Sequence, residues 1–114
     1  MRLIRIDHVS LDVDDRSRSI EWYEDVVGLR ASGPPGAVDE PVFVGSAGAR
    51  LGLFQERAPG LRHIALATDA HGYDATVERL TRLAVVFRVE RHGASRSVYF
   101  EDPDGTTLEV TDLE

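Results

Sequence analysis

Two histidines and one glutamate share the chemistry of divalent-metal ligands and occur at related positions in the sequence. His8 and His63 lie 55 residues apart, and Glu109 follows in the segment TTLEVT. Imidazole nitrogens and carboxylate oxygens bind first-row ions such as Fe²⁺, Mn²⁺, Zn²⁺ and Ni²⁺. The sequence has no cysteine, so no thiolate ligand competes with them. A histidine taken alone is more often a residue satisfied by hydrogen bonds than a metal ligand, whereas three ligands on one face favour a metal site.

Alternation along the predicted strands places these residues on matching faces. In residues 3–13 polar and apolar side chains alternate, and neighbours on a strand point to opposite sides. The same parity elsewhere gathers small and polar residues: His8, Ser10, Asp12, His63, Ala65, Ala67, Ser97, Tyr99, Glu101, Thr107, Glu109 and Thr111. A ligand cavity needs such room with a few convergent polar groups. We therefore predict that this face lines a cavity, while the apolar face lies under helices.

The same order of elements occurs twice along the chain. Each half is expected to contain a strand, a helix and then three strands. An offset of 57 residues pairs Gly48 with Gly105 and Gly52 with Glu109. Seven of these eight strands have a clear range, at residues 3–13, 41–46, 50–54, 61–68, 85–89, 97–101 and 106–111, with one helix within 14–28 and another around Tyr73, Val77 and Leu80. We predict an α+β fold and a single domain over 1–114, with module one at about 1–57 and module two at about 58–114.

Composition excludes several classes of function. Thirteen Lys and Arg face twenty Asp and Glu, and the resulting net charge of −7 repels polyanions. Charged residues interrupt the apolar ones in MRLIRIDHVSLDV, so neither a signal-peptide core nor a membrane span is expected there. We expect a cytoplasmic protein with no nucleic-acid or membrane partner.

Four segments together resemble a known superfamily over nearly the whole chain: RIDHVSLDV, IEWYEDVVGL, LRHIALAT and SVYFEDPDGTTLEV. Their order and spacing are similar to the vicinal-oxygen-chelate proteins, which include glyoxalases, bleomycin-resistance and fosfomycin-resistance proteins and extradiol dioxygenases. The resemblance implies two βαβββ modules that form a cup-shaped open barrel. It also implies one divalent metal ion held by His8, His63 and Glu109.

Two branches of this superfamily differ from the chain at functional positions. Glyoxalase I enzymes carry a fourth metal ligand where this chain has Gly52, which has no side chain. Fosfomycin-resistance transferases are similar at Ser10, where they carry Thr, and at Ser97 and Tyr99. However, a cationic residue that they use for the phosphonate aligns near Val89. The resemblance therefore implies neither of these two activities.

Extradiol dioxygenases are similar at one further position. They carry a tyrosine ten residues before the glutamate, where Tyr99 stands relative to Glu109, and a proton-handling histidine upstream of it. His92 lies in the corresponding segment but about two residues nearer the tyrosine. The alternative is that His92 is a solvated loop residue and Tyr99 part of the cavity wall.

These observations predict a divalent-metal-dependent enzyme that acts as a Lewis acid on a small oxygen-rich substrate. Tyr99 and Ser10 are expected to orient the substrate or move a proton, while the reaction stays open among lyase, isomerase, transferase and dioxygenase. The alternative is a metal-free protein of the bleomycin-resistance kind that binds a drug or metabolite in the same cup. A homodimer is also expected, because two small modules leave sheet edges that a second chain can cover.

Overall fold

A computed structural model describes residues 3–33, 36–46 and 48–113, which form seven β-strands, two α-helices and a short π-helix. The strands are β1 (Leu3–Val13), β2 (Val42–Ser46), β3 (Ala49–Gln55), β4 (Gly60–Thr68), β5 (Phe87–His92), β6 (Ser95–Glu101) and β7 (Thr107–Asp112). The helices are α1 (Arg16–Trp22), η1 (Tyr23–Val27) and α2 (Ala70–Arg82). The predicted α+β class is confirmed.

Within the described ranges the chain divides into two compact units, residues 7–62 and residues 3–6 with 63–113. The expected single domain stays a prediction.

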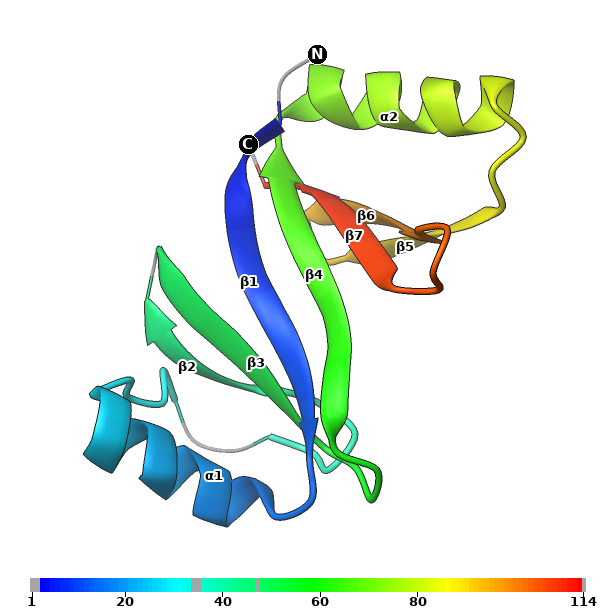
Figure 1. Ribbon diagram of the computed structural model, residues 1–114. Helices are drawn as coiled ribbons and strands as arrows, with labels where there is room; N and C mark the ends of the chain where they lie inside the picture. Colours follow the sequence, from blue (N-terminus) through cyan, green and yellow to red (C-terminus); the bar gives the residue numbers. More distant parts are fainter. Residues whose placement is uncertain (1–2, 34–35, 47, 114) are drawn as a thin grey trace. The chain divides into compact units, whose positions relative to one another are not determined.

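In the first unit the strands follow the order β2-β3-β1. β1 runs parallel to β3, with Ser10 opposite Gly52, and β2 is antiparallel to β3. The helical segment packs against β3 through α1 (Figure 1). Residue 47, in the turn predicted between β2 and β3, lies outside the described residues.

The first helix begins and ends at residues whose types favour those positions. Asp15 caps α1, because its side chain accepts a hydrogen bond of 3.1 Å from the backbone N–H of Arg18. The helical segment ends at Gly28, whose φ of 81° lies in the left-handed region that glycine adopts at low cost. The helical segment lies within the predicted range 14–28. Its π-helical turn η1 was not predicted, since apolar spacing does not distinguish it from an α-helical turn.

One of the three strands expected after the first helix is reduced to a single bridge between Ala31 and Val44. The sequence that follows Ala31, SGPPGAVDEP, is rich in glycine and proline. Proline lacks the N–H that a strand ladder needs, and glycine weakens strands. The first module therefore keeps the predicted order with a shortened first hairpin strand.

In the second unit the order is β4-β7-β6-β5 (Figure 1). β4 runs parallel to β7, with Ala65 opposite Glu109, and β6 pairs antiparallel with both β7 and β5. Both units therefore place their first strand parallel to their last one. This common arrangement confirms the predicted repeat.

The strand registers also confirm the offsets between the two halves. The pair Ser10–Gly52 in the first unit corresponds to the pair Ala65–Glu109 in the second. Ser10 and Ala65 are 55 residues apart, as are His8 and His63, and Gly52 and Glu109 are 57 apart. Gly52 is therefore the structural equivalent of Glu109.

The core of the second unit lies between α2 and its sheet. Its buried members are Tyr73, Leu80, Val98 and Val110, with Leu66, Val77, Val85, Phe87 and Phe100 packed around them. This is the apolar face predicted from strand parity, covered by a helix as expected. In the described ranges no helix is both long and apolar enough to cross a membrane.

Two leucines near the end of α2 provide a matched test of this packing. Leu80 is 7% exposed and belongs to the core, whereas Leu83 is 62% exposed. We expect Leu80→Ala to lower the free energy of unfolding by about 2 to 5 kcal/mol through lost burial and a cavity. Leu83→Ala should change it by less than about 0.5 kcal/mol. Urea unfolding followed by circular dichroism measures both, and equal effects would contradict the assigned core.

Candidate metal centre

The polar face of the second unit carries the residues that alternate with its core residues. Tyr99 lies directly opposite Glu109 across the β6–β7 pair, and Ser97 lies opposite Thr111. Ala65 lies opposite Glu109 on the other side, across the β4–β7 pair. Residues opposite one another on one face have Cβ atoms about 4.5 to 5.5 Å apart. Tyr99 and Glu109 are therefore neighbours, as the sequence predicts.

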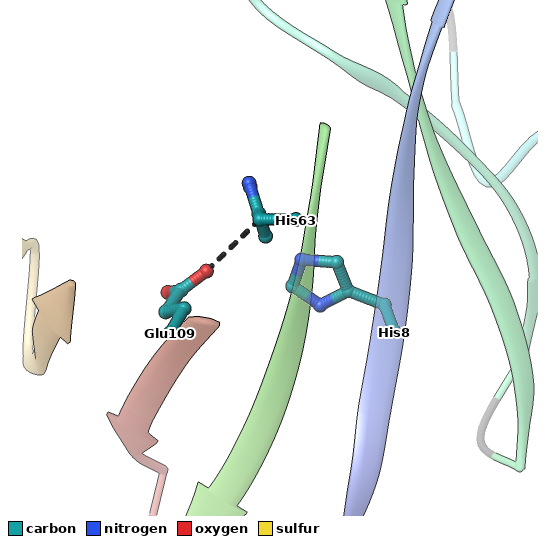
Figure 2. Close-up of side chains that lie close together, drawn as sticks. All are labelled: His8, His63 and Glu109. Carbon is teal, nitrogen blue, oxygen red and sulfur yellow. Dashed lines mark ion pairs between the residues drawn. The ribbon is translucent and has the colours of Figure 1, made fainter. Parts of the chain in front are cut away.

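Glu109 is a buried carboxylate, 5% exposed, with a different neighbour at each oxygen. The hydroxyl of Ser97 donates a hydrogen bond of 2.7 Å to Oε2. Nε2 of His63, a residue that is 9% exposed, lies 3.1 Å from Oε1, and Figure 2 shows this contact as a dashed line. Such partners are needed because a buried carboxylate without them is strongly disfavoured.

The contact between His63 and Glu109 fits two ligands of one ion. Two ligand atoms about 2.1 Å from the same ion, at right angles to each other, are about 3.0 Å apart. Nε2 of His63 and Oε1 of Glu109 are 3.1 Å apart. A direct hydrogen bond has a similar length, so the same pair is also stable without an ion.

The ring of His8 is held within the first unit by two kinds of contact. Its Nδ1 lies 2.7 Å from a carboxylate oxygen of Asp7, which accepts the hydrogen bond, and Arg50 donates to the same oxygen at 3.1 Å. The ring of Phe43 lies edge-on to the imidazole, with centroids 5.1 Å apart. A carboxylate at Nδ1 favours the tautomer in which Nε2 carries the lone pair that binds a metal.

His8 in the first unit and His63 and Glu109 in the second are residues that can each offer one ligand atom to a divalent ion. Figure 2 draws the three side chains. Two imidazoles and one carboxylate suit a first-row divalent ion rather than Ca²⁺ or a soft ion, which prefer all-oxygen or sulfur ligands. The residues present therefore fit the metal that the sequence resemblance implies.

Tyr99 is kept protonated by its surroundings. Burial raises its pKa to about 12, and the negative carboxylate of Glu109 with its hydrogen bond acts in the same direction. The guanidinium of Arg88, 4.2 Å from the centre of the phenol ring, acts in the opposite direction with a smaller effect. At neutral pH Tyr99 therefore carries an O–H that can donate a hydrogen bond.

His92 lies on a strand and contacts Tyr99, whereas the alternative from the sequence placed it in a solvated loop. Its Nε2 lies 3.1 Å from the hydroxyl oxygen of Tyr99. β5 continues to His92, and the antiparallel register with β6 pairs Arg88 with Tyr99 and His92 with Ser95. His92 thus shares the face of Tyr99 although its spacing along the chain is shorter than the family pattern. The side chain is 49% exposed, so one side of it meets solvent.

Ser10 is fully buried on β1, beside Gly52. A Cβ atom at position 52 would lie 2.9 Å from the ring of Phe43 and 3.1 Å from the hydroxyl of Ser10. The space that a fourth ligand would need is therefore filled by these two side chains. The expected role of Ser10 in substrate binding stays a prediction.

Sequence reasoning gave no role to two residues that contact the candidate ligands. Asp7 could have been found from its place directly before His8, although strand parity assigns adjacent side chains to opposite faces. Ser97 appeared on the predicted polar face, but no sequence signal pointed its hydroxyl at Glu109. Both depend on side-chain rotamers, which residue spacing does not specify.

Comparison with known proteins supports the family resemblance found in the sequence. A sequence model described as Glyoxalase/Bleomycin resistance protein/Dioxygenase superfamily matches residues 5–110. The crystal structure of methylmalonyl-CoA epimerase from Mycobacterium tuberculosis superposes with a TM-score of 0.79 and 21% identity, over 98% of this chain and 89% of that one. A variant of the Streptomyces coelicolor methylmalonyl-CoA epimerase, in complex with 2-nitronate-propionyl-CoA, has a TM-score of 0.75 and 21% identity, over 97% and 95%. These two likenesses establish the fold.

A third similar structure contains a metal. The Mn(II)-bound glyoxalase from Novosphingobium aromaticivorans superposes with a TM-score of 0.83 and 25% identity over 98% of this chain. The match covers 39% of that longer chain.

The raised pKa of Tyr99 gives a test on metal-free protein. The difference in near-ultraviolet phenolate absorbance between wild type and Tyr99→Phe should titrate near pH 12 rather than at the ordinary value of about 10. Replacing the carboxylate in Glu109→Gln should lower this pKa, because the neighbouring negative charge is removed. The raised pKa stabilises the folded protein below about pH 10, and this stabilisation is lost as the pH rises to about 12. A Tyr99 titration near pH 10 would contradict the described surroundings.

Proposed function

Since the chain belongs to the Glyoxalase/Bleomycin resistance protein/Dioxygenase superfamily, we propose that it is a divalent-metal-dependent enzyme acting on a small oxygen-rich substrate. His8, His63 and Glu109 would hold one ion, which is Fe²⁺, Mn²⁺, Zn²⁺ or Ni²⁺ on the chemistry of these ligands. Support for a metal comes from the Mn(II) of the similar glyoxalase.

The observation that carries this proposal is the buried pair of His63 and Glu109. Both residues lie on rigid strands, with Nε2 and Oε1 3.1 Å apart, and the second carboxylate oxygen is occupied by Ser97. A purely structural role would be met at lower cost by apolar residues, because burying ionisable groups is unfavourable even when they are paired. Rigid placement of two ligand atoms at ligand spacing is what a metal site requires.

The bound ion would act as a Lewis acid that stabilises negative charge developing on a substrate oxygen. The protein would supply the remaining functions through its side chains. Tyr99 holds a proton at neutral pH and can donate it, or a hydrogen bond, to a substrate oxygen, while His92 accepts from or donates to the same hydroxyl. Ser10 would help to orient the substrate. Ala65, the residue paired with Glu109 on β4, has a side chain that ends at Cβ.

The competing function is metal-free binding of a drug or metabolite, as in bleomycin resistance. It needs an enclosed surface but no ligand set, and it assigns no purpose to the pairing of His63 with Glu109. Binding of an organic ligand by a protein that takes up none of the four ions would favour this alternative.

We also propose that the chain forms a homodimer in solution. In the second unit β5 is the outer strand; Val86, directly before it, is 89% exposed and Val89, within it, is 55% exposed. An unpaired edge with apolar side chains is a surface that a second chain can cover.

The metal proposal predicts that wild-type protein binds one divalent ion per chain. At an ion concentration about 100 times the dissociation constant, the ion should stabilise the fold by about 2.7 kcal/mol. His63→Ala, Glu109→Ala and His8→Ala should each lose this binding and retain the native circular dichroism spectrum. His71→Ala and Glu101→Ala replace exposed residues of the same types and should bind as wild type does. Elemental analysis and calorimetry measure the binding, and no uptake of any of the four ions by wild type would refute the proposal.

The homodimer predicts a solution mass of twice the chain mass of 12.6 kDa. Light scattering coupled to size-exclusion chromatography measures this mass directly. A single species of chain mass at micromolar concentration would rule the dimer out.

A further inference from the structure

We propose that Ser97 is a positioning residue that holds the Glu109 carboxylate in the orientation needed for metal binding. This inference rests on the proposed function of His8, His63 and Glu109 as ligands and assigns a role to a residue outside that set. Ser97 itself would touch neither metal nor substrate.

The contact is direct and lies in the interior of the protein. Ser97 has no exposed surface, and its hydroxyl donates a hydrogen bond of 2.7 Å to Oε2 of Glu109. The other oxygen, Oε1, is the one that lies 3.1 Å from Nε2 of His63. The hydrogen bond therefore distinguishes the two oxygens, with Oε2 held by β6 and Oε1 directed to the ligand side.

Glu109 needs such a constraint because its last torsion angle is soft. The terminal χ3 angle of glutamate has a broad distribution with two-fold symmetry, so the side chain alone does not choose which oxygen faces a ligand position. Tyr99 lies directly opposite Glu109 and also hydrogen-bonds its carboxylate. Without Ser97, whose hydroxyl also hydrogen-bonds Tyr99, the phenol and His63 would remain as the partners of the carboxylate, and neither would hold Oε2 on the β6 side. A hydroxyl at position 97 keeps Oε1 as the single oxygen oriented to act as a metal ligand.

Packing alone does not explain a serine at this position. A buried hydroxyl is unfavourable unless it is hydrogen-bonded, and alanine would fill nearly the same volume. The neighbouring residues on this face of β4, Ala65 and Ala67, are fully buried alanines. The Ser97 hydroxyl donates a hydrogen bond to Glu109, and an alanine at this position would remove that donor.

Mn²⁺ affinity measured by calorimetry tests this role, with metal-free melting temperature as the second readout. We expect Ser97→Ala to weaken Mn²⁺ binding by about 10- to 100-fold, the usual effect of removing a partner that orients a metal ligand. Ser97→Thr keeps the hydroxyl and should restore affinity, whereas Ser97→Val has the same shape as threonine without it and should not. Ser95→Ala is the matched control on the same strand, because the Ser95 hydroxyl donates to the backbone carbonyl of His92 instead.

The outcomes separate this inference from the proposed function. If wild type binds none of the four ions, the metal site itself is refuted. If wild type binds Mn²⁺ and Ser97→Ala binds it equally well, Ser97 has only a structural role and the inference is overturned, even if the melting temperature falls. If Ser97→Ala does not fold, the threonine and valine variants decide, and equal affinity in these two would overturn the inference.

Discussion

Burial of the Glu109 carboxylate is the constraint on which the polar face of the second unit depends. At 5% exposure the carboxylate has lost most of its water, and one unsatisfied buried acceptor costs about 1 to 3 kcal/mol. Ser97 on β6 and His63 on β4 meet its two oxygens from opposite sides of β7. Both strand registers must therefore be correct for the carboxylate to be satisfied. Burial of Tyr99, directly opposite Glu109, raises the pKa of its phenol and keeps it neutral.

Strand parity explains why much of the fold and part of the site could be predicted from sequence. Alternation assigned Tyr99 and Glu109 to the polar face and their apolar neighbours to the helix side; in the structure Tyr99 lies opposite Glu109, and the neighbours Val98 and Val110 lie in the core under α2. What parity could not supply are contacts set by rotamers or by pairing across a hairpin. Spacing along the chain pointed to a loop position for His92, but its distance to Tyr99 is fixed by the register of β5 on β6. Likewise, the hydrogen bond from His8 to Asp7 joins adjacent residues that alternation would separate.

The two modules share a backbone arrangement but use equivalent positions differently. Glu109 on β7 corresponds to Gly52 on β3, as the pairings with Ala65 and Ser10 show. In the first module the space in front of that position is occupied by Phe43, whose ring also contacts His8 and lies under the guanidinium of Arg50. A side chain at position 52 would require Phe43 to move. The first module thus combines one histidine with packing, and the second combines one histidine with a carboxylate.

Because side chains along β7 alternate between its two faces, the face of each residue depends on its exact position in the strand. Insertion or deletion of one residue within the strand would exchange the sides of Glu109 and Val110, placing a carboxylate against α2 and an aliphatic chain beside His63. Such a shift would harm the core and the polar face in a single step. The turn before β7 is not subject to this alternation. Its shape comes from local hydrogen bonds that the backbone N–H groups of Asp104 and Thr106 donate to the side chain of Asp102. We therefore expect changes of chain length to be tolerated in turns of this kind rather than within β7.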